Sequence, residues 1–410
     1  MLDSLLNSLE YRKIDLSLER IVSVLEQFNN PHLHYPIVHV AGTNGKGSVC
    51  AYLASILSEA GYRVGLYTSP HLVDWSERIS INKKPISTED LTKLVSEIID
   101  LTIPLTIPLT QFEVITAAGW LYFARNFVDI AVIEVGLGGR LDATNVVPNP
   151  LVTVITSISL DHIQLLGSTL ADIAREKAGI IKAHSPVVVG QLPLQAAEVI
   201  QQRATELDSN ISWIAPAIEL NGLCQWQDII YQLPLNGEVQ LQNSALAIAT
   251  SKILIEKKWQ ISDRTIIQGI ASTDWPGRLQ WLNWQGRSIL IDGAHNPASA
   301  QALRSYVEKL NKPLHWIVGI LASKDHRQIL SNLLRPGDRL SLVPIPDNPT
   351  AELQELNNLA QIICPELEQV EIYEDLFLAL EQANWQERLI IVTGSLYLVG
   401  YFLSDQLTQS

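Results

Sequence analysis

Residues 36–60 read PIVHVAGTNGKGSVCAYLASILSEA, and this stretch decides the fold of the first half of the chain. The run IVHVA at 37–41 is apolar and rich in β-branched residues, which predicts a buried strand. Residues 49–60 place apolar side chains at three- and four-residue intervals, which predicts an amphipathic helix. Between them lies the glycine-rich loop GTNGKGS, residues 42–48. A strand, such a loop and a helix in this order predict a phosphate-binding loop at the edge of an α/β sheet.

The residue types of this loop suit contacts with a nucleotide. Glycines let backbone amides turn towards phosphate oxygens, and the N-terminus of the following helix adds a partial positive charge. Lys46 would meet the terminal phosphates and Ser48 a Mg²⁺ ion. The alternative is an ordinary glycine-rich turn. All seven loop residues are candidate contacts: Gly42, Thr43, Asn44, Gly45, Lys46, Gly47 and Ser48.

The alternation of strands and helices continues through the first half and predicts a doubly wound, mostly parallel α/β sheet. A further helix is predicted over residues 112–125. Residues 211–241 show short alternating runs with Asn236-Gly237 between them, which predicts a small antiparallel excursion. The two prolines of LTIPLTIPLT, residues 101–110, predict an extended connection. The further strands are expected at residues 63–67, 129–135, 151–155 and 186–190.

The alternation restarts after Asp274-Trp275-Pro276-Gly277-Arg278, and a Pro-Gly pair is typical of a domain boundary. We therefore expect a first domain over residues 1–284 and a smaller α/β domain over residues 285–410. Strands of the second domain are expected at residues 288–291, 314–319, 339–343 and 389–392.

Composition excludes several classes of protein. The 410 residues carry a net charge of -14 without a basic tract, which disfavours binding to nucleic acid. The three cysteines, Cys50, Cys224 and Cys364, lack the spacing of metal ligands. The first twenty residues do not have the pattern of a leader peptide, and no apolar run reaches about 18 residues. We expect a cytoplasmic monomer that binds neither nucleic acid nor membranes.

Of two candidate metal ligands, one suggests a metal site by its own chemistry and the other does not. Glu134 ends a predicted buried strand, at the carboxyl edge where open α/β sheets bind ligands, and it supplies the hard oxygens that Mg²⁺ prefers. Imidazole is an uncommon ligand of Mg²⁺, so His162 by itself favours a hydrogen-bonding histidine in a loop.

The motifs of this sequence, in their order, resemble folylpolyglutamate synthase/dihydrofolate synthase, a family of the Mur ligase group. The resemblance runs from about Ile14 to Tyr397. It implies a large P-loop-type, Mur-ligase-type ATP-binding domain with a mostly parallel sheet and a smaller Rossmann-like C-terminal (glutamate ligase) domain, with the active site between them. The motifs are GTNGKGS at 42–48, TSPHL at 68–72, EVGLGGRLDATN at 134–145, DH at 161–162, REKAGI at 175–180 and DGAHNP at 292–297.

The resemblance implies ATP and Mg²⁺ as cofactors. It assigns contacts with Mg²⁺ to Ser69, Glu134 and His162, which Ser48 joins. It assigns nucleotide contacts to Asn243, Arg278 and Asp292. Each of these three has a simpler interpretation: Asn243 as a helix N-cap, Arg278 as a solvated linker residue, and Asp292 as part of a solvent-facing turn.

The family's substrate positions map onto both halves of the chain. His295 and Ser395 resemble positions that receive the incoming L-glutamate. A pteroate or folate would bind the TQFE and LDA segments, where Phe112 could stack on the ring and Asp142 could meet its amino nitrogens. Phe112 as part of the helix core is the alternative. The segments comprise Thr110, Gln111, Phe112, Glu113, Leu141, Asp142 and Ala143.

Lys177, in REKAGI, is by residue type a lysine on the exposed face of a helix. In this family the lysine of that motif is carbamylated by CO₂, which implies a catalytic role beside Lys46 and His295. A carbamate would give Mg²⁺ hard anionic oxygens where an ammonium would compete with it.

The resemblance implies ATP-dependent ligation of L-glutamate to dihydropteroate and to reduced folates through an acyl phosphate. Another Mur-type ligase acting on a different carboxylate is the first alternative, although only about 35 residues precede the first strand. A non-catalytic nucleotide switch is the second, and it would have no need of Glu134, His162, Arg278 and Asp292 together.

Overall fold

The computed structural model describes residues 2, 5–6, 9, 17–102 and 108–409. By its internal contacts the chain divides into two units. The second unit comprises the chain from Asp274 onward together with two short earlier segments, Leu160–His162 and Leu235–Val239. The remaining described residues up to Thr273 form the first unit.

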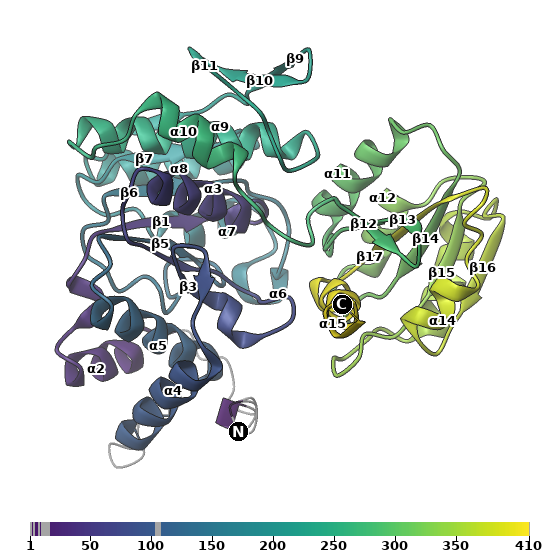
Figure 1. Cartoon of the computed structure of the whole chain (residues 1–410), viewed down its shortest axis with the longest axis horizontal. Coiled ribbons are helices and arrows are strands. Elements are labelled where there is room, and N and C mark those ends of the chain that lie inside the picture. Colours follow the sequence, from purple (N-terminus) through teal and green to yellow (C-terminus); the bar gives the residue numbers. More distant parts are fainter. Residues whose placement is uncertain (1, 3–4, 7–8, 10–16, 103–107, 410) are drawn as a thin grey trace. The chain divides into compact units, whose positions relative to one another are not determined.

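An eight-stranded sheet forms the centre of the first unit, in the order β4-β3-β2-β5-β1-β6-β7-β8 (Figure 1). From β2 to β8 neighbouring strands run parallel, and only β3 and β4 are antiparallel additions at one edge. The strands expected from the sequence in this half are confirmed, as is the mostly parallel sheet. Their bounds are β1 (Ile37–Ala41), β2 (Val64–Tyr67), β3 (Ile79–Ile81), β4 (Lys84–Pro85), β5 (Ile130–Glu134), β6 (Val152–Ile155), β7 (Val187–Val189) and β8 (Ile211–Trp213).

Helices cover both faces of this sheet. Figure 1 shows α3, α9 and α10 on one face and α2, α4 and α5 on the other. Large apolar side chains such as Trp120 and Phe123 of α5 are fully buried in the core beneath the second face, and each such burial stabilises the fold by roughly 1.5–3 kcal/mol. The helices are α2 (Glu19–Gln27), η1 (Pro31–Leu33), α3 (Lys46–Glu59), η2 (Trp75–Arg78), α4 (Thr88–Thr102), α5 (Gln111–Arg125), α6 (Ile163–Leu166), α7 (Leu170–Ala178), α8 (Leu194–Glu206), α9 (Val239–Glu256) and α10 (Asp263–Ala271).

Helix α10 packs very closely against α3, the helix that follows the glycine-rich loop. A Cβ atom added to Gly269 would lie 2.4 Å from the Cα of Ile56, so only glycine fits there. The Ser55 hydroxyl donates to the carbonyl of Gly269 at 2.6 Å. The C-terminal half of α3 is therefore held in place by close packing against α10.

The antiparallel excursion is confirmed, but its turn lies elsewhere than expected. Strands β9 (Ile218–Leu220), β10 (Leu223–Trp226) and β11 (Ile229–Tyr231) form a separate antiparallel sheet. The Asn-Gly turn of this sheet is Asn221-Gly222, which joins β9 to β10, and both of its residues have positive φ. Asn236-Gly237 lies after β11. Positive φ is what a two-residue hairpin turn requires, and either Asn-Gly pair could supply it.

A six-stranded sheet in the order β12-β13-β17-β14-β15-β16 forms the second unit, with β12 antiparallel and the others parallel. The expected division near residue 284 lies between β12 and β13, two strands that pair along their whole length in this unit. The strands are β12 (Gln280–Trp284), β13 (Arg287–Ile291), β14 (Leu314–Val318), β15 (Arg339–Leu342), β16 (Gln369–Ile372) and β17 (Leu389–Thr393). The helices are α11 (Pro297–Glu308), α12 (His326–Leu333), α13 (Leu353–Ile363), α14 (Leu376–Glu381) and α15 (Leu396–Gln409).

The extended connection and the absence of a membrane span were also expected from the sequence. Helix α4 ends at Thr102, and the extended connection expected over LTIPLTIPLT falls largely on residues 103–107, which lie outside the described residues. Among the helices that the structure describes, none is long and apolar enough to cross a membrane.

Candidate functional site

The glycine-rich loop joins the carboxyl end of β1 to the N-terminus of α3. Gly45 precedes the helix with φ of 84°, a left-handed conformation that glycine adopts without strain. A Cβ atom on Gly45 would also lie 2.4 Å from Oδ1 of Asn243 in α9. The loop therefore needs glycine here for both its backbone and its contact with α9.

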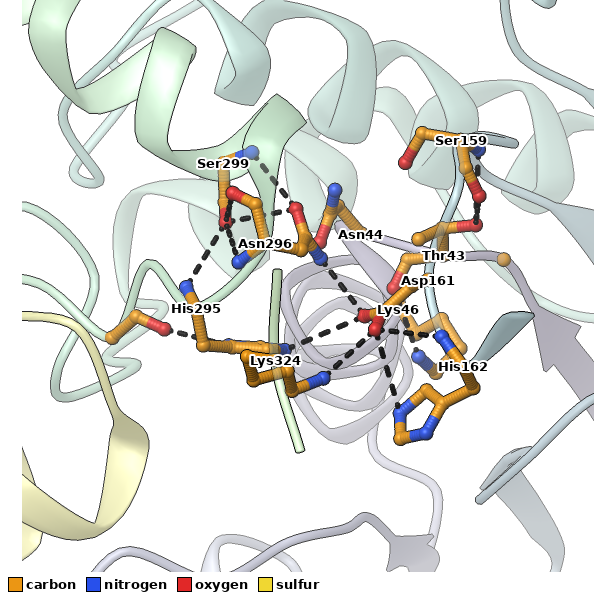
Figure 2. A network of polar contacts seen from close by, with 12 residues as sticks. Thr43, Asn44, Lys46, Ser159, Asp161, His162, His295, Asn296, Ser299 and Lys324 are labelled. Atoms are coloured by element: carbon orange, nitrogen blue, oxygen red, sulfur yellow. Dashed lines mark hydrogen bonds and ion pairs between the residues drawn. The ribbon is translucent and has the colours of Figure 1, made fainter. Parts of the chain in front are cut away.

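Residues that follow β6 hold the loop in place. The backbone N–H of Thr43 donates to the carbonyl of Ser157 at 2.8 Å, and that of Asn44 donates to the Ser157 hydroxyl at 3.0 Å. Thr43 and Ser159 exchange two hydrogen bonds through the Thr43 hydroxyl, each 3.1 Å long (Figure 2). The loop is thus pre-organised by the neighbouring strand.

Lys46 and Glu134 meet at the carboxyl edge of the sheet. Glu134 ends β5, which pairs with β1, and its carboxylate lies 3.8 Å from Nζ of Lys46. Lys46 also donates to the carbonyl of Thr43 at 3.2 Å, and the backbone N–H of Ser69 donates to Glu134 at 3.2 Å. Glu134 is buried, so its charge is balanced by these neighbours.

The expected metal ligands of the first unit supply the right donor chemistry for Mg²⁺. Ser48, Ser69 and Glu134 offer hydroxyl and carboxylate oxygens, which are hard ligands, around the Lys46 side chain and the start of α3. His162 belongs to the second unit, where its ring lies 3.8 Å from the Asp161 carboxylate. Within the described ranges no three His, Cys, Asp or Glu residues cluster as a metal site. The oxygen set fits Mg²⁺ rather than a metal that prefers histidine and cysteine.

Asn243 lies within α9 rather than at its start, because that helix begins at Val239. The N-cap interpretation of Asn243 is therefore wrong. Its side chain donates to Oε1 of Gln240 at 3.0 Å, and Nε2 of Gln240 donates to the Ser48 hydroxyl at 3.3 Å. Gln240 was not expected at this site. The signal in the sequence was its place three residues before Asn243, which puts both on one side of a helix.

Lys177 lies in α7 and is 4% exposed, so the interpretation as a surface lysine is wrong. Its Nζ donates to the carbonyl of Gly42, the first residue of the glycine-rich loop, at 2.8 Å. A lysine is seldom buried without a specific partner, and here the partner is the loop itself.

The TQFE segment starts α5 with a capping box. Thr110 caps the helix, and the Glu113 carboxylate accepts from the Thr110 backbone and hydroxyl, both at 2.7 Å. Arg20 donates to both oxygens of Glu113 at 3.1 and 3.2 Å. Thr110 and Glu113 therefore have structural partners already, and Gln111 and Phe112 are only partly buried. The Phe112 ring lies against Gly136, just beyond Glu134, where a Cβ atom would meet it at 2.3 Å.

Asp142 anchors the loop that follows Glu134. Its carboxylate accepts from the N–H of Leu137 at 2.8 Å and from the N–H and hydroxyl of Thr144 at 3.0 and 2.5 Å. Burial raises the pKa of Asp142, against these hydrogen bonds, which lower it. The Thr144 hydroxyl in turn contacts Nε2 of buried His39 at 2.9 Å. Leu141 and Ala143 flank this anchor as partly buried and buried residues.

In the second unit, Asp292 follows β13 and organises the turn around it. Its carboxylate accepts from the N–H groups of Leu279 and Ala294, both at 2.9 Å, so it has structural partners within the turn and is only partly exposed. Burial raises the pKa of Asp292, while the nearby Arg278 charge lowers it. Arg278 is partly buried, and its side chain lies close to Gly293.

A polar cluster surrounds Asp161 in the second unit (Figure 2). Lys324 donates to Asp161 at 2.8 Å, Asn296 donates to it at 3.1 Å, and Nε2 of His295 lies 3.9 Å away. Although burial raises the pKa of Asp161, the charges of Lys324 and His162 outweigh it and hold that pKa well below its usual range. Burial and the Lys324 charge lower the pKa of His295 to about 4, so its ring is neutral at pH 7. Asp161 and Lys324 were not expected as site residues.

Ser395, the other residue expected to contact glutamate, lies between β17 and α15. It is buried, and its hydroxyl accepts from the N–H of Tyr397 at 3.1 Å at the start of α15. A serine in this position satisfies a free amide at a helix N-terminus.

Comparisons with known proteins find similar proteins over nearly the whole chain. Residues 40–251 match the Mur ligase middle domain family and residues 279–405 the C-terminal domain of dihydrofolate synthetase. The chain is 36% identical to the folylpolyglutamate synthase of Lacticaseibacillus casei, over 93% of this chain and 92% of that protein. It is also 36% identical to the dihydrofolate synthetase of Saccharomyces cerevisiae, over 95% and 97% of the two chains.

A solved structure is similar to this chain over almost its whole length. The Mycobacterium tuberculosis folylpolyglutamate synthase complexed with ADP and AMPPCP superposes with a TM-score of 0.88 at 31% identity, over 98% of this chain and 97% of that one. Both sheets of the present chain and its glycine-rich loop thus fall within a match that spans almost the whole protein. Sequence and structure together place the chain in the folylpolyglutamate synthase/dihydrofolate synthase family of Mur ligases.

Proposed function

We propose that this chain is an ATP-dependent amide ligase that joins L-glutamate to dihydropteroate and to reduced folates through an acyl phosphate. The observation that carries the proposal is the pre-organised glycine-rich loop, with Lys46 beside Glu134 at the carboxyl edge of the sheet. A free carboxylate does not acylate an amine at neutral pH, so the ligase must first activate it with ATP. Phosphoryl transfer depends on positioning and charge neutralisation, which this edge of the sheet supplies.

The first unit would bind the nucleotide. Backbone amides of residues 42–48 would surround the phosphates, Lys46 would neutralise the γ-phosphate, and Asn243 would meet the adenine. Ser48, Ser69, Glu134 and His162 would hold Mg²⁺, which when bound adds positive charge at the transferring phosphate. We propose that Arg278 and Asp292 of the second unit contribute further nucleotide contacts.

The chain's own residues would also orient the two other substrates. Phe112 would stack on the pterin ring, and Gln111, Leu141, Asp142 and Ala143 would surround it. His295, neutral at pH 7, would contact and orient the incoming glutamate, with Ser395 as a second contact. Cofactors are thus ATP and Mg²⁺, and the other partners are small molecules. We propose a cytoplasmic monomer.

We expect the protein to add glutamate to two kinds of substrate, dihydropteroate and reduced folates. Relatives of equal identity are named for the two activities, and the TQFE and LDA segments are both present at the edge of the sheet. Purified protein with ATP, Mg²⁺ and L-glutamate should therefore form dihydrofolate from dihydropteroate and should also extend tetrahydrofolate. The products are separated by liquid chromatography and identified by mass.

Omission of each substrate is the control for this assay, since ADP should form in quantity only when both a pterin carboxylate and glutamate are present. Glutamylation of tetrahydrofolate alone would limit the function to folylpolyglutamate synthesis. ADP production that needs neither acceptor would favour a nucleotide switch. Ligation of a different carboxylate would favour another Mur-type ligase.

The acyl phosphate makes a separate prediction about oxygen atoms. When the pteroate or folate carboxylate carries ¹⁸O, one labelled oxygen should pass to the released phosphate, because the carboxylate attacks the γ-phosphorus and the amine later expels phosphate. Mass spectrometry of the phosphate measures the transfer. Label in AMP, with pyrophosphate as the second product, would exclude this route in favour of an adenylate.

A further inference from the structure

Gln240 is a buried polar residue to which the proposed chemistry assigns no role. It is the second residue of α9 and 3% exposed. A buried polar side chain costs stability unless its donors and acceptors are paired.

Both the nitrogen and the oxygen of the Gln240 side-chain amide form hydrogen bonds inside the site. Nε2 donates to Oγ of Ser48 at 3.3 Å, and Oε1 accepts from Nδ2 of Asn243 at 3.0 Å. Ser48 and Asn243 are themselves 4% and 5% exposed, so water has little access to these bonds. The side chain thus bridges the first turn of α3 and the first turns of α9.

Each bond restricts the neighbour on which it acts. By donating to Ser48, Gln240 occupies one lone pair of the hydroxyl oxygen, which directs the other lone pair and the hydrogen elsewhere. By accepting from Asn243, it fixes which way that amide faces, and Oδ1 of Asn243 is then left against Gly45 of the loop. Without Gln240, both side chains would gain rotamer freedom that must be lost again on binding.

We propose that Gln240 is a positioning residue of the nucleotide site, whose amide orients Ser48 and Asn243 together. The contact of Ser48 with the metal and the contact of Asn243 with the nucleotide then form one pre-organised unit. The inference rests on the proposed function, because Ser48 and Asn243 are proposed ligands. Gln240 acts through these two residues, to which its side chain is hydrogen-bonded.

The test is the affinity of the full chain for ADP, measured by calorimetry with excess Mg²⁺ and again with EDTA. Gln240→Met keeps the approximate volume and removes both hydrogen bonds. We expect the Kd for ADP to rise about tenfold with Mg²⁺ and about threefold in EDTA, where only Asn243 is affected. The KM for glutamate should not change. Gln202→Met, on the exposed face of α8, is the matched control and should bind ADP as the wild type does.

A second background separates positioning from general damage. If Gln240 acts through Ser48, then adding Gln240→Met to Ser48→Ala should raise the Kd by about threefold whether or not Mg²⁺ is present. A full tenfold effect in that background, or an unchanged Kd for Gln240→Met alone, would overturn the inference. Thermal unfolding is measured for each variant, and Gln240→Ala replaces Gln240→Met if the methionine variant does not fold.

These outcomes are distinct from failure of the proposed function. A wild type that binds ADP and makes glutamylated product, with a Gln240→Met variant that matches it, would remove the inference and leave the function. A wild type that makes no glutamylated product, with ADP binding that still depends on Gln240 as described, would support the inference and remove the assigned acceptors.

Discussion

Lys46→Ala is expected to abolish ligation while the chain still folds. Lys46 is partly exposed, with 16% of its side chain accessible, and its partners are the Glu134 carboxylate and one carbonyl of its own loop. Its charge would oppose the phosphate charge that develops during transfer. Loss of one such pre-organised contact commonly raises the barrier by ~3–4 kcal/mol, or lowers the rate a hundredfold or more. Steady-state release of ADP with dihydropteroate and glutamate measures the loss.

Folding is checked by thermal unfolding, since Glu134 keeps the Ser69 amide as a partner after the substitution. Lys93→Ala is the matched control, because Lys93 lies on the exposed face of α4, where it pairs with Glu89 of the same helix. It should retain full activity. A Lys46→Ala variant with most of its activity would show that the glycine-rich loop is structural.

Lys177→Ala is expected to lose ligation by a similar factor and to regain part of it when acetate is supplied at high concentration. The structure places Nζ of Lys177 against the carbonyl of Gly42, away from solvent. Only an uncharged amine reacts with CO₂, and burial favours the uncharged form of a lysine. The resulting carbamate would carry two anionic oxygens near the start of the loop, and a free carboxylate can partly replace them.

Two measurements follow this prediction. Ligation is assayed with and without acetate, and ¹³C NMR of the protein in labelled bicarbonate looks for a carbamate signal that Lys177→Ala lacks. Lys257→Ala, at an exposed position after α9, is the control. Full activity of Lys177→Ala without acetate would reduce Lys177 to a structural residue that holds the loop through Gly42.

The glycine-rich loop shows how far local sequence reaches. Its strand, its turn and its helix follow from β-branched runs, glycine and helical periodicity within 25 residues of chain, and all three are present where expected. The family also follows from ordered motifs. The weaker expectations concern partners that are distant in sequence: the Asn-Gly turn was assigned to the wrong pair because both pairs satisfy the same local rule.

Burial is where sequence reasoning about single residues failed. Lys177 was given a solvent-exposed alternative and Asn243 a capping alternative from their residue types, but the structure buries Lys177 against Gly42 and places Asn243 inside a helix. Gln240 and Lys324 were missed for the same reason. Glutamine and lysine have no distinguishing local pattern, and their importance arises from what the fold places beside them.

By itself the sequence determined the α/β class, the order of strands and helices, the phosphate-binding loop and the family. Each of these depends on side chains within a few residues of one another, where steric preference and periodicity act directly. Only the tertiary structure decided that Glu134 lies beside Lys46, that Lys177 reaches Gly42 from a helix 135 positions away, and that Gln240 bridges Ser48 and Asn243. Glu134 meets Lys46 because parallel strands bring their carboxyl ends to one edge of a sheet. Lys177 and Gln240 make their contacts because helices distant in the sequence pack beside the glycine-rich loop and α3, which is a property of the packed chain rather than of any segment in it.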